Sequence, residues 1–163
     1  GVGDGLKVTQ IRLGTARLTH CMRWLGLSKR CLEEASAYVA HRMSFGQTLA
    51  AHEGVQWMLG DVAKDIQIGR LLTMQAAWKL DQGDFARSDI SIAKIHAADT
   101  LHKAADTAIQ LLGARGYSKD TIVEWIYRYA RQARLVDGAS EIHKMVLSRA
   151  YLSEGQDFFR WGV

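Results

Sequence analysis

Residues 88–112 read SDISIAKIHAADTLHKAADTAIQLL, and this stretch decides the fold class. Its apolar and small side chains recur at intervals of three, four or seven positions, which places them on one face of an α-helix. That face consists of Ile90, Ala97, Leu101, Ala104, Ala108 and Leu111. The alanines indicate close approach by a neighbouring helix, and Gly113 is a suitable C-cap. The stretch therefore predicts a long helix that is buried along one side.

The sequence on either side predicts further long helices. Residues 9–41 and 49–80 carry similar stripes, with a break at Gly46 between them and a turn at residues 81–84 after them. A last helix is predicted to begin near Ser140 and to turn three apolar side chains inward, Ile142, Val146 and Leu147. An apolar tail follows that is suited to packing on a partner, made of Phe158, Phe159 and Trp161.

A shorter helix is predicted after Tyr117. Asp120 or Thr121 is placed to cap it, and Thr121 with Glu124 has the spacing of a capping box. No stretch sustains the alternation typical of strands. The chain has 163 residues and no proline, which suits one domain of long, uninterrupted helices. These patterns predict an all-α fold, an up-and-down four-helix bundle with an extra short helix, over residues 9–163.

Composition and charge argue against several classes of protein. Apolar residues make up 48% and charged residues 23%, which is typical of a globular chain. No run of 18 apolar residues predicts a membrane span, and a net charge of +4 from dispersed residues does not favour a nucleic-acid partner. Cys21 and Cys31 fall on one predicted helix, where ten residues rise about 15 Å, too far for a disulfide. We therefore expect a reducing, cytoplasmic location.

Generic catalytic motifs do not explain the chain. Its six histidines show no metal-ligand spacing, and no Glu-x-x-His pair supports di-iron chemistry. No Gly-x-Ser-x-Gly elbow and no phosphate-binding glycine loop is present either. On these grounds alone we predict no metal site, and the function stays open.

Three separated stretches, taken in order, resemble the signatures of one enzyme family. Residues 42–49, RMSFGQTL, resemble the pattern Arg-x-x-Phe-Gly-x-x-Leu of acyl-CoA dehydrogenases. Residues 110–117, QLLGARGY, resemble their Gln-x-x-Gly-Gly-x-Gly-Tyr segment. Residues 127–142, YRYARQARLVDGASEI, are similar to Tyr-Arg-Asp-Ala-Arg followed by Tyr-Glu-Gly-Thr and Ile. The resemblance spans nearly the whole chain and implies the carboxy-terminal helical domain of such an enzyme.

The resemblance implies a flavin-dependent reaction. Acyl-CoA dehydrogenases oxidise an acyl thioester between its α and β carbons, with FAD as hydride acceptor. They combine an amino-terminal helical domain, a middle β-barrel domain and a carboxy-terminal bundle, so residues 1–8 are expected to be a linker remnant from the middle domain. The resemblance further implies an acyl-CoA substrate, assembly into a dimer or tetramer through the bundle, and an electron-transfer acceptor.

Asp137 stands where much of the family carries the glutamate that removes the α proton. Its side chain is one methylene shorter, which displaces the carboxylate by about 1 Å. Three interpretations stay open: Asp137 is the base in a branch with altered geometry, it serves another substrate as in nitroalkane oxidase, or it caps the following helix.

The resemblance also assigns cofactor and substrate contacts. Arg42 would bind the pyrophosphate of FAD from a neighbouring subunit, although an arginine at a helix end also satisfies the last carbonyls. Phe45 would pack beside the nucleotide, or simply in the core. The remaining predicted FAD contacts are Gln110, Leu111, Leu112, Gly113, Ala114, Ala139 and Glu141. Arg17 and Gly138 are predicted near the substrate. Arg17 would orient the loop that carries Asp137 or touch the thioester region, and an exposed helical arginine would equally need no explanation at this position.

These assignments predict the bundle domain of an FAD-dependent acyl-CoA dehydrogenase. By itself, this chain is expected to bind FAD weakly and to be inactive. The alternatives are a flavin-dependent oxidase related to nitroalkane oxidase, or a non-catalytic helical assembly module.

Overall fold

The computed structural model describes residues 1–160, and Trp161 of the predicted apolar tail lies outside them. The elements, in chain order, are α1 (Gly5–Val39), β1 (Met43–Ser44), β2 (Gln47–Thr48), a 3₁₀ turn η1 (Leu49–Ala51), α2 (Glu53–Asp81), α3 (Arg87–Leu112), α4 (Ala114–Tyr117), α5 (Val123–Ala133), α6 (Ser140–Glu154) and a 3₁₀ turn η2 (Gly155–Phe159). The predicted all-α class is confirmed, with one hairpin of two-residue strands that the sequence did not predict.

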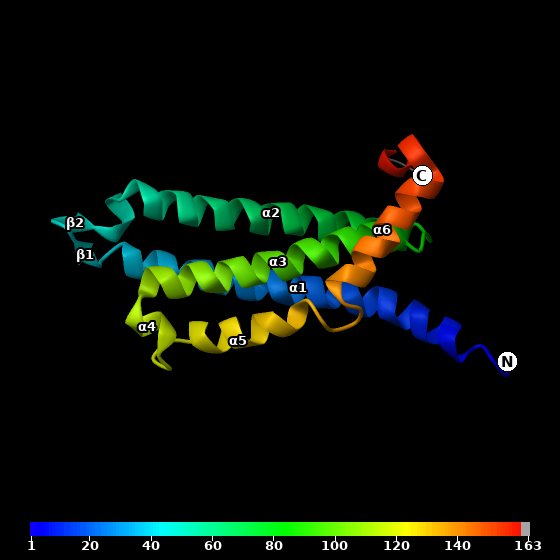
Figure 1. Cartoon of the computed structure of the whole chain (residues 1–163), viewed down its shortest axis with the longest axis horizontal. Helices are drawn as coiled ribbons and strands as arrows, with labels where there is room; N and C mark the ends of the chain where they lie inside the picture. The colour runs from blue at the N-terminus through cyan, green and yellow to red at the C-terminus, as the bar shows by residue number, and fades with distance from the viewer. Residues whose placement is uncertain (161–163) are drawn as a thin grey trace.

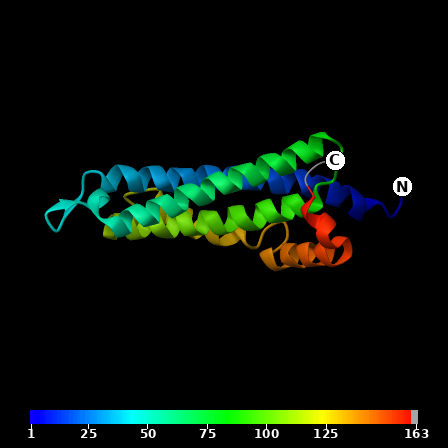
Figure 2. The same cartoon turned by 90° about the horizontal axis from the view of Figure 1, so that it is seen from above.

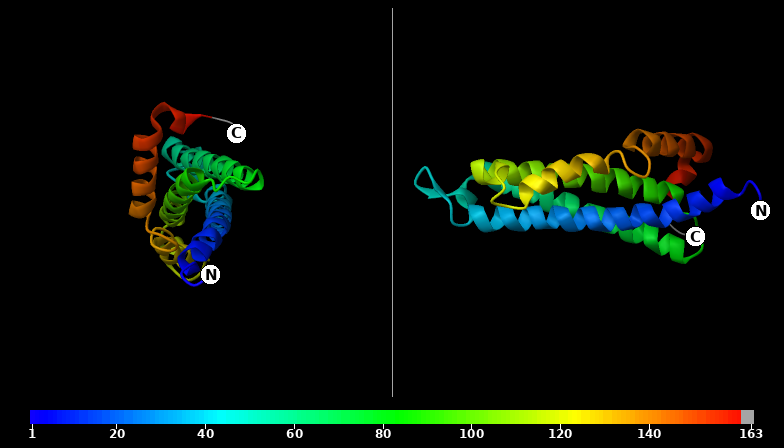
Figure 3. Two further views of the ribbon diagram at one scale, coloured as in Figure 1. Left: turned by 90° about the vertical axis from the view of Figure 1, so that its right-hand side faces the viewer. Right: turned by 90° about the horizontal axis from the view of Figure 1, so that it is seen from below.

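The three long helices lie side by side and alternate in direction (Figures 1 and 2). α5 runs beside α1 and α3, so α1, α2, α3 and α5 form the up-and-down bundle. α6 does not join that bundle as a parallel member. It packs on α3 and runs across the bundle at a steep angle, as the end view of Figure 3 makes clear.

The core of the bundle is built around α3. All six residues of its predicted stripe are buried, from Ile90 to Leu111. Small side chains on this stripe let α1 pack closely, and α1 contributes Cys21, Trp24 and Cys31 to the same core. Both cysteines carry free thiols, and burial raises the pKa of each to about 12. A helix at the surface of a bundle buries one stripe only. α3 contacts α1, α2, α5 and α6, so it is buried more completely than they are.

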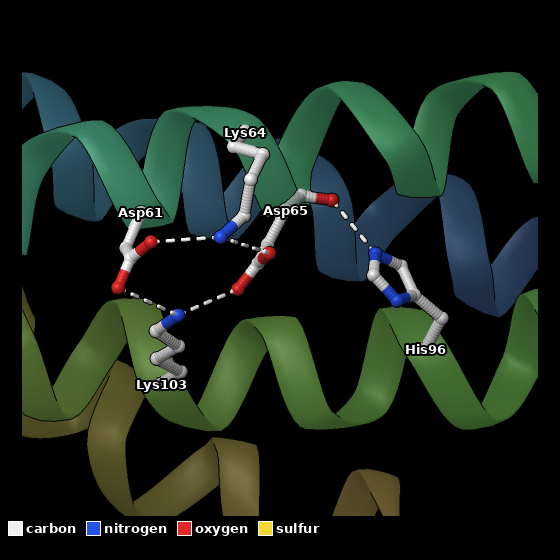
Figure 4. Close-up of polar contacts among 5 residues, drawn as sticks. All are labelled: Asp61, Lys64, Asp65, His96 and Lys103. Atoms are coloured by element: carbon white, nitrogen blue, oxygen red, sulfur yellow. Dashed lines mark hydrogen bonds and ion pairs between the residues drawn. The ribbon is translucent and has the colours of Figure 1, made fainter.

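A polar clamp joins α2 to α3 at the surface (Figure 4). Lys103 Nζ lies 2.8 Å from Asp65 Oδ2 and 3.7 Å from Asp61 Oδ2. Lys64 pairs with Asp61 at 2.7 Å, and His96 Nε2 donates to the Asp65 carbonyl at 2.8 Å. Because exposed ion pairs each contribute little to stability, apolar packing and not this clamp holds the two helices together.

The last two helices differ from prediction in detail. Ile142 was expected inside but is 50% exposed, and the fully buried side chains of α6 are Ser140 and His143. The capping box does not form, because Glu124 pairs with Arg128 at 2.6 Å, while Thr121 Oγ1 accepts a hydrogen bond from the Val123 amide at 3.4 Å.

The described chain is helical near both of its ends. The first helix begins at Gly5, four residues earlier than predicted. Phe158 and Phe159 pack around Tyr151 of α6, with ring centroids 5.9 and 5.7 Å away, and Phe159 stays 62% exposed. Among residues 1–160, no helix combines the length and the apolar character that crossing a membrane requires.

Candidate active site

The loop of residues 134–139 carries the predicted base between α5 and α6 (Figure 1). Asp137 and Gly138 both adopt positive φ angles, 50° and 100°. Aspartate is among the few non-glycine residues that tolerate this region, and glycine enters it freely. The Ser140 amide donates to the Arg134 carbonyl at 3.1 Å and closes the loop. The local sequence thus produces a tight turn with Asp137 at its tip.

Two side chains of α1 hold Asp137 from one side. Arg17 Nε donates to the Asp137 carbonyl at 2.8 Å, and His20 Nε2 lies 2.9 Å from Asp137 Oδ2. Residues 17 and 20 are three apart, so one face of α1 presents both. The Asp137 side chain is 27% exposed, so the carboxylate is held but remains open to a ligand.

A buried lysine of α3 supports the same loop from beneath. Lys94 is only 1% exposed, and its Nζ donates to the Gly138 carbonyl at 2.8 Å and to the Ala133 carbonyl at 3.5 Å. Burial lowers the pKa of Lys94, and the Arg17 charge lowers it further. The ammonium also lies 5.5 Å from the Trp24 ring centroid, within range of a cation–π contact. Lys94 therefore ties the end of α5 and the loop to the central helix.

His143 of α6 lies directly against the loop. It is 3% exposed, and its Nδ1 is 3.0 Å from Ser91 Oγ. Burial, together with the charges of Lys94 and Arg17, lowers the pKa of His143 to about 4, so its ring is neutral at pH 7. A Cβ at position 138 would lie 3.1 Å from His143 Nε2, which explains why glycine is needed there.

Three buried polar atoms near the loop have no hydrogen-bond partner among the described residues. They are Trp24 Nε1, Ser140 Oγ and His143 Nε2. Such groups are rare in folded proteins because each costs the free energy of its lost hydration. Ser140 and His143 follow the loop directly, and Trp24 stacks on His20, which contacts Asp137.

The predicted site residues divide between two places. Arg17, Asp137 and Gly138 come together, and Ala139 and Glu141 follow at the start of α6, where Glu141 is exposed. The other group lies toward the far end of the bundle, at the hairpin and the end of α3 (Figure 1). From His20 to the end of α1 at Val39 the helix rises about 28 Å, so one chain cannot bring both groups to one small ligand.

The far group presents exposed, uncommitted functional groups. The turn of Phe45 and Gly46 has positive φ at both residues, as a two-residue hairpin requires, and leaves Phe45 97% exposed. Arg42 and Gln110 are exposed, and among residues 1–160 neither side chain makes an ion pair or hydrogen bond. Gly113 and Ala114 are exposed as well, whereas the side chains of Leu111 and Leu112 belong to the core.

This second group fits the cofactor that the resemblance implies. A guanidinium suits the pyrophosphate of FAD, and a side-chain amide and an open aromatic face suit its adenosine half. Leu111 and Leu112 would contribute backbone groups only. No group of three histidine, cysteine or acidic residues able to hold a metal ion occurs in the part of the chain that the structure describes.

Sequence reasoning missed His20, Lys94 and His143. A signal for Lys94 was present, since it lies four residues after Ile90 and three before Ala97, on the stripe predicted to be buried. A lysine at such a position needs buried acceptors. For His20 and His143 no local signal exists, because their partners are 117 and 52 residues away in sequence.

The geometry therefore defines a helical-bundle domain with the Asp137 carboxylate on a polar loop between α5 and α6. Residues 3–152 match the family described as "Acyl-CoA dehydrogenase, C-terminal domain", and the chain belongs to this family. The resemblance drawn from the motifs is thereby confirmed.

Individual relatives agree with this membership. The Mycobacterium tuberculosis protein named "Probable acyl-CoA dehydrogenase FadE2" is 36% identical over 163 residues, covering 99% of this chain and 40% of the relative. A glutaryl-coenzyme A dehydrogenase solved with glutaryl-CoA superposes with a TM-score of 0.90 at 30% identity, over 100% of this chain and 41% of that one. Butyryl-CoA dehydrogenase from Megasphaera elsdenii superposes with a TM-score of 0.88 at 30% identity, over 92% of this chain and 39% of that one. The chain thus spans about two fifths of the length of these proteins.

Proposed function

We propose that this chain is the bundle domain of an FAD-dependent acyl-CoA dehydrogenase, in which Asp137 removes the α proton of an acyl-CoA thioester. The observation that carries the proposal is the placement of Asp137. Its carbonyl is fixed by Arg17 and its carboxylate by His20, yet the side chain stays 27% exposed. A general base needs this combination of a fixed position and an accessible oxygen.

In the proposed reaction, this chain's own residues carry out one step, the removal of a proton from the substrate. A carboxylate oxygen of Asp137 takes the proton from the α carbon, and the α–β double bond forms as a hydride departs from the β carbon. The chemistry that bound FAD supplies is acceptance of that hydride. Proton and hydride together account for the two electrons and two hydrogens lost by the substrate. Gly138 and Arg17 lie beside the base, where the thioester would be oriented.

FAD would be held by residues from two copies of the chain. Arg42, Phe45 and the segment from Gln110 to Ala114 would bind the dinucleotide of one active site. Ala139 and Glu141, at the start of α6, would approach the flavin of another. The separation of about 28 Å along α1 supports this division, since the two groups serve different cofactors more easily than one. A homodimer or homotetramer follows, with an electron-transfer acceptor to reoxidise the flavin.

The proposal extends to the organisation and location of the complete enzyme. Residues 1–8 are the proposed linker from a middle domain, with residues 5–8 already helical in α1, and residues 9–163 are the proposed bundle domain. Alone, this chain would bind FAD weakly and have little activity, because the middle domain supplies the flavin ring's remaining contacts. We place the enzyme in the cytoplasm, in keeping with the two free thiols of α1.

The decisive experiment is Asp137→Asn in the full-length enzyme reconstituted with FAD. Anaerobic mixing with a panel of acyl-CoA thioesters should bleach the flavin absorbance of the wild type, while the variant should lose at least about 100-fold in rate. An unchanged rate would identify Asp137 as a structural residue.

The same experiment can identify the alternative function, a flavin-dependent oxidase. Asp137 favours this alternative because its side chain is shorter than the glutamate of much of the family. In that case nitroalkanes would reduce the flavin, acyl-CoA would not, and oxygen would reoxidise it directly. If neither substrate reduced the flavin, the domain would serve assembly only.

A further inference from the structure

We infer that His20 is a positioning residue for the Asp137 carboxylate, and that Arg23 holds His20 in the state that this task requires. The inference rests on the proposed function in one respect, that Asp137 is the base. It adds two side chains of α1 to the site, neither of which belongs to the motifs that led to the family.

The His20 ring is held on three sides. Its Nε2 lies 2.9 Å from Asp137 Oδ2, and its Nδ1 meets Arg23 Nη2. The face of the ring stacks on Trp24, with centroids 5.3 Å apart and planes 18° apart. Arg23 and Trp24 follow His20 by three and four residues, so one turn of α1 supplies both. The imidazole therefore has one fixed orientation toward the loop.

Arg23 determines which ring nitrogen carries the hydrogen. A guanidinium is a donor only, so His20 Nδ1 must accept its hydrogen bond with a lone pair. In the neutral ring the hydrogen then sits on Nε2, which points at the carboxylate and donates to it. His20 in this state is a hydrogen-bond donor to Asp137 and does not compete for the substrate's proton.

Arg23 is itself anchored on the neighbouring helix. Its guanidinium carbon lies 6.0 Å from the centroid of the Tyr129 ring on α5. Tyr129 stacks on Trp125, with centroids 5.1 Å apart and planes 15° apart. Although the Arg23 side chain is exposed, a cation above a stacked pair of aromatic rings has a preferred position. The contacts run from α5 through Arg23 and His20 to Asp137.

The contacts through Arg23 and His20 fix the carboxylate of Asp137, which the hydrogen bonds to the loop backbone leave free to rotate. Arg17 and Lys94 hold the loop by its carbonyl oxygens, but neither touches the carboxylate. Without His20 the carboxylate would rotate, and its oxygens would leave the direction of the substrate's α carbon. Because proton transfer depends steeply on position, the rate should fall while substrate binding stays intact.

The hydrogen-bond chain is tested first in this 163-residue chain, without cofactor. Nitrogen-15 spectra of the histidine side chains should show the Nε2–H tautomer of His20, with its proton protected from solvent exchange. Asp137→Ala should remove that protection, and Arg23→Met should allow the Nδ1–H form to appear. Arg12→Met, an exposed arginine on the same helix, is the control and should leave the signal unchanged. A His20 proton that is unprotected, or insensitive to both changes, would overturn the inference.

The positioning role is tested in the full-length enzyme loaded with FAD. His20→Leu should lower the rate of flavin reduction by about 10- to 100-fold with little change in KM, as expected for a misplaced base. His20→Gln keeps a donor near the position of Nε2 and should recover most of that loss. If Leu and Gln give equal rates, a positioning role is ruled out.

The two proposals fail in distinguishable ways. Full activity of Asp137→Asn would remove the proposed function. An inactive Asp137→Asn beside a fully active His20→Leu would leave the function in place and remove only the role of His20.

Discussion

Gly138 is the residue of the loop that should tolerate substitution least. Its φ of 100° is unfavourable for any side chain, and a Cβ would meet His143 Nε2 at 3.1 Å and Arg17 Nη2 at 3.7 Å. Gly138→Ala should lower the free energy of unfolding by about 2–4 kcal/mol, measured by urea denaturation. Gly83→Ala separates the two causes, because Gly83 has a φ of 86° with nothing within 4 Å. It should cost only about 1–2 kcal/mol, and equal losses would mean that the contact with His143 is unimportant.

His143 should make stability depend on pH. Its pKa falls from 6.5 to about 4 on folding, so between these values the unfolded chain binds a proton that the folded chain does not. Its contribution is complete above pH 6.5 and is lost as the pH falls toward 4. Between pH 7 and pH 4.5 this amounts to about 2 kcal/mol. His143→Gln should reduce the pH dependence of unfolding by that amount, and a variant with the wild-type slope would contradict it.

Among individual site residues, the sequence predicted only those that the family resemblance identifies. Asp137 and Gly138 were predicted because a motif contains them, and Arg17 because of its position in the family resemblance. Lys94 could have been found, since a charge within an apolar stripe signals buried acceptors. His20 and His143 acquire their partners only when α1, α3 and α6 pack around the loop, and no local pattern records such contacts.

Among the helices, α3 connects the core to the loop through Lys94. Lys94→Met should leave the carbonyls of Ala133 and Gly138 without their donor and lower the free energy of unfolding by about 1–3 kcal/mol. Amide hydrogen exchange in residues 134–139 should accelerate more than elsewhere. Lys103→Met, on the exposed clamp of the same helix, should cost less than about 1 kcal/mol and leave loop exchange unchanged. Uniform acceleration along the chain would mean that Lys94 does not act on the loop.

Two glycines of α2 test how closely the helices pack. Gly60 is exposed with open space around it, so Gly60→Ala should stabilise the protein by about 0.5–1 kcal/mol through helix propensity. At Gly69 a Cβ would lie 2.6 Å from Leu25 Cδ2 and 3.2 Å from His96. Gly69→Ala should therefore be less stable than Gly60→Ala by about 1–2 kcal/mol, measured by thermal or urea denaturation. Two variants of equal stability would indicate that α1 and α2 have room to separate.

The predicted elements were right where apolar periodicity ran over many turns. The bounds of α3 differ from prediction by one residue, at its start. Ile142 was placed wrongly because three apolar residues in one short helix do not define a face, and α6 crosses the bundle and does not join it. Tyr129 and Asp137 both depart from the family pattern, and in the structure Arg23 and His20 lie between them.

For the whole molecule, the proposed function divides the two groups of site residues between copies of the chain. The hairpin with Arg42 and the loop with Asp137 lie toward different ends of one rigid bundle (Figure 1). Such a bundle cannot fold back on itself to unite them. A second copy of the chain, placed so that its hairpin end approaches this loop, resolves the separation without any change of fold.

The outer face of α2 is suited to hold such copies together. Its exposed apolar side chains fall on one stripe opposite the core face of the helix, and they are Trp57, Ile68, Leu71, Met74 and Trp78. An apolar stripe of this length on a bundle surface is typical of an interface. Leu71→Lys combined with Met74→Lys should therefore shift the chain from dimer or tetramer to monomer in light scattering after gel filtration. Met22→Lys, an exposed methionine on α1, should leave the mass unchanged. A wild-type chain that stays monomeric at high micromolar concentration would refute assembly through this face, and full-length enzyme would then have to associate through other domains.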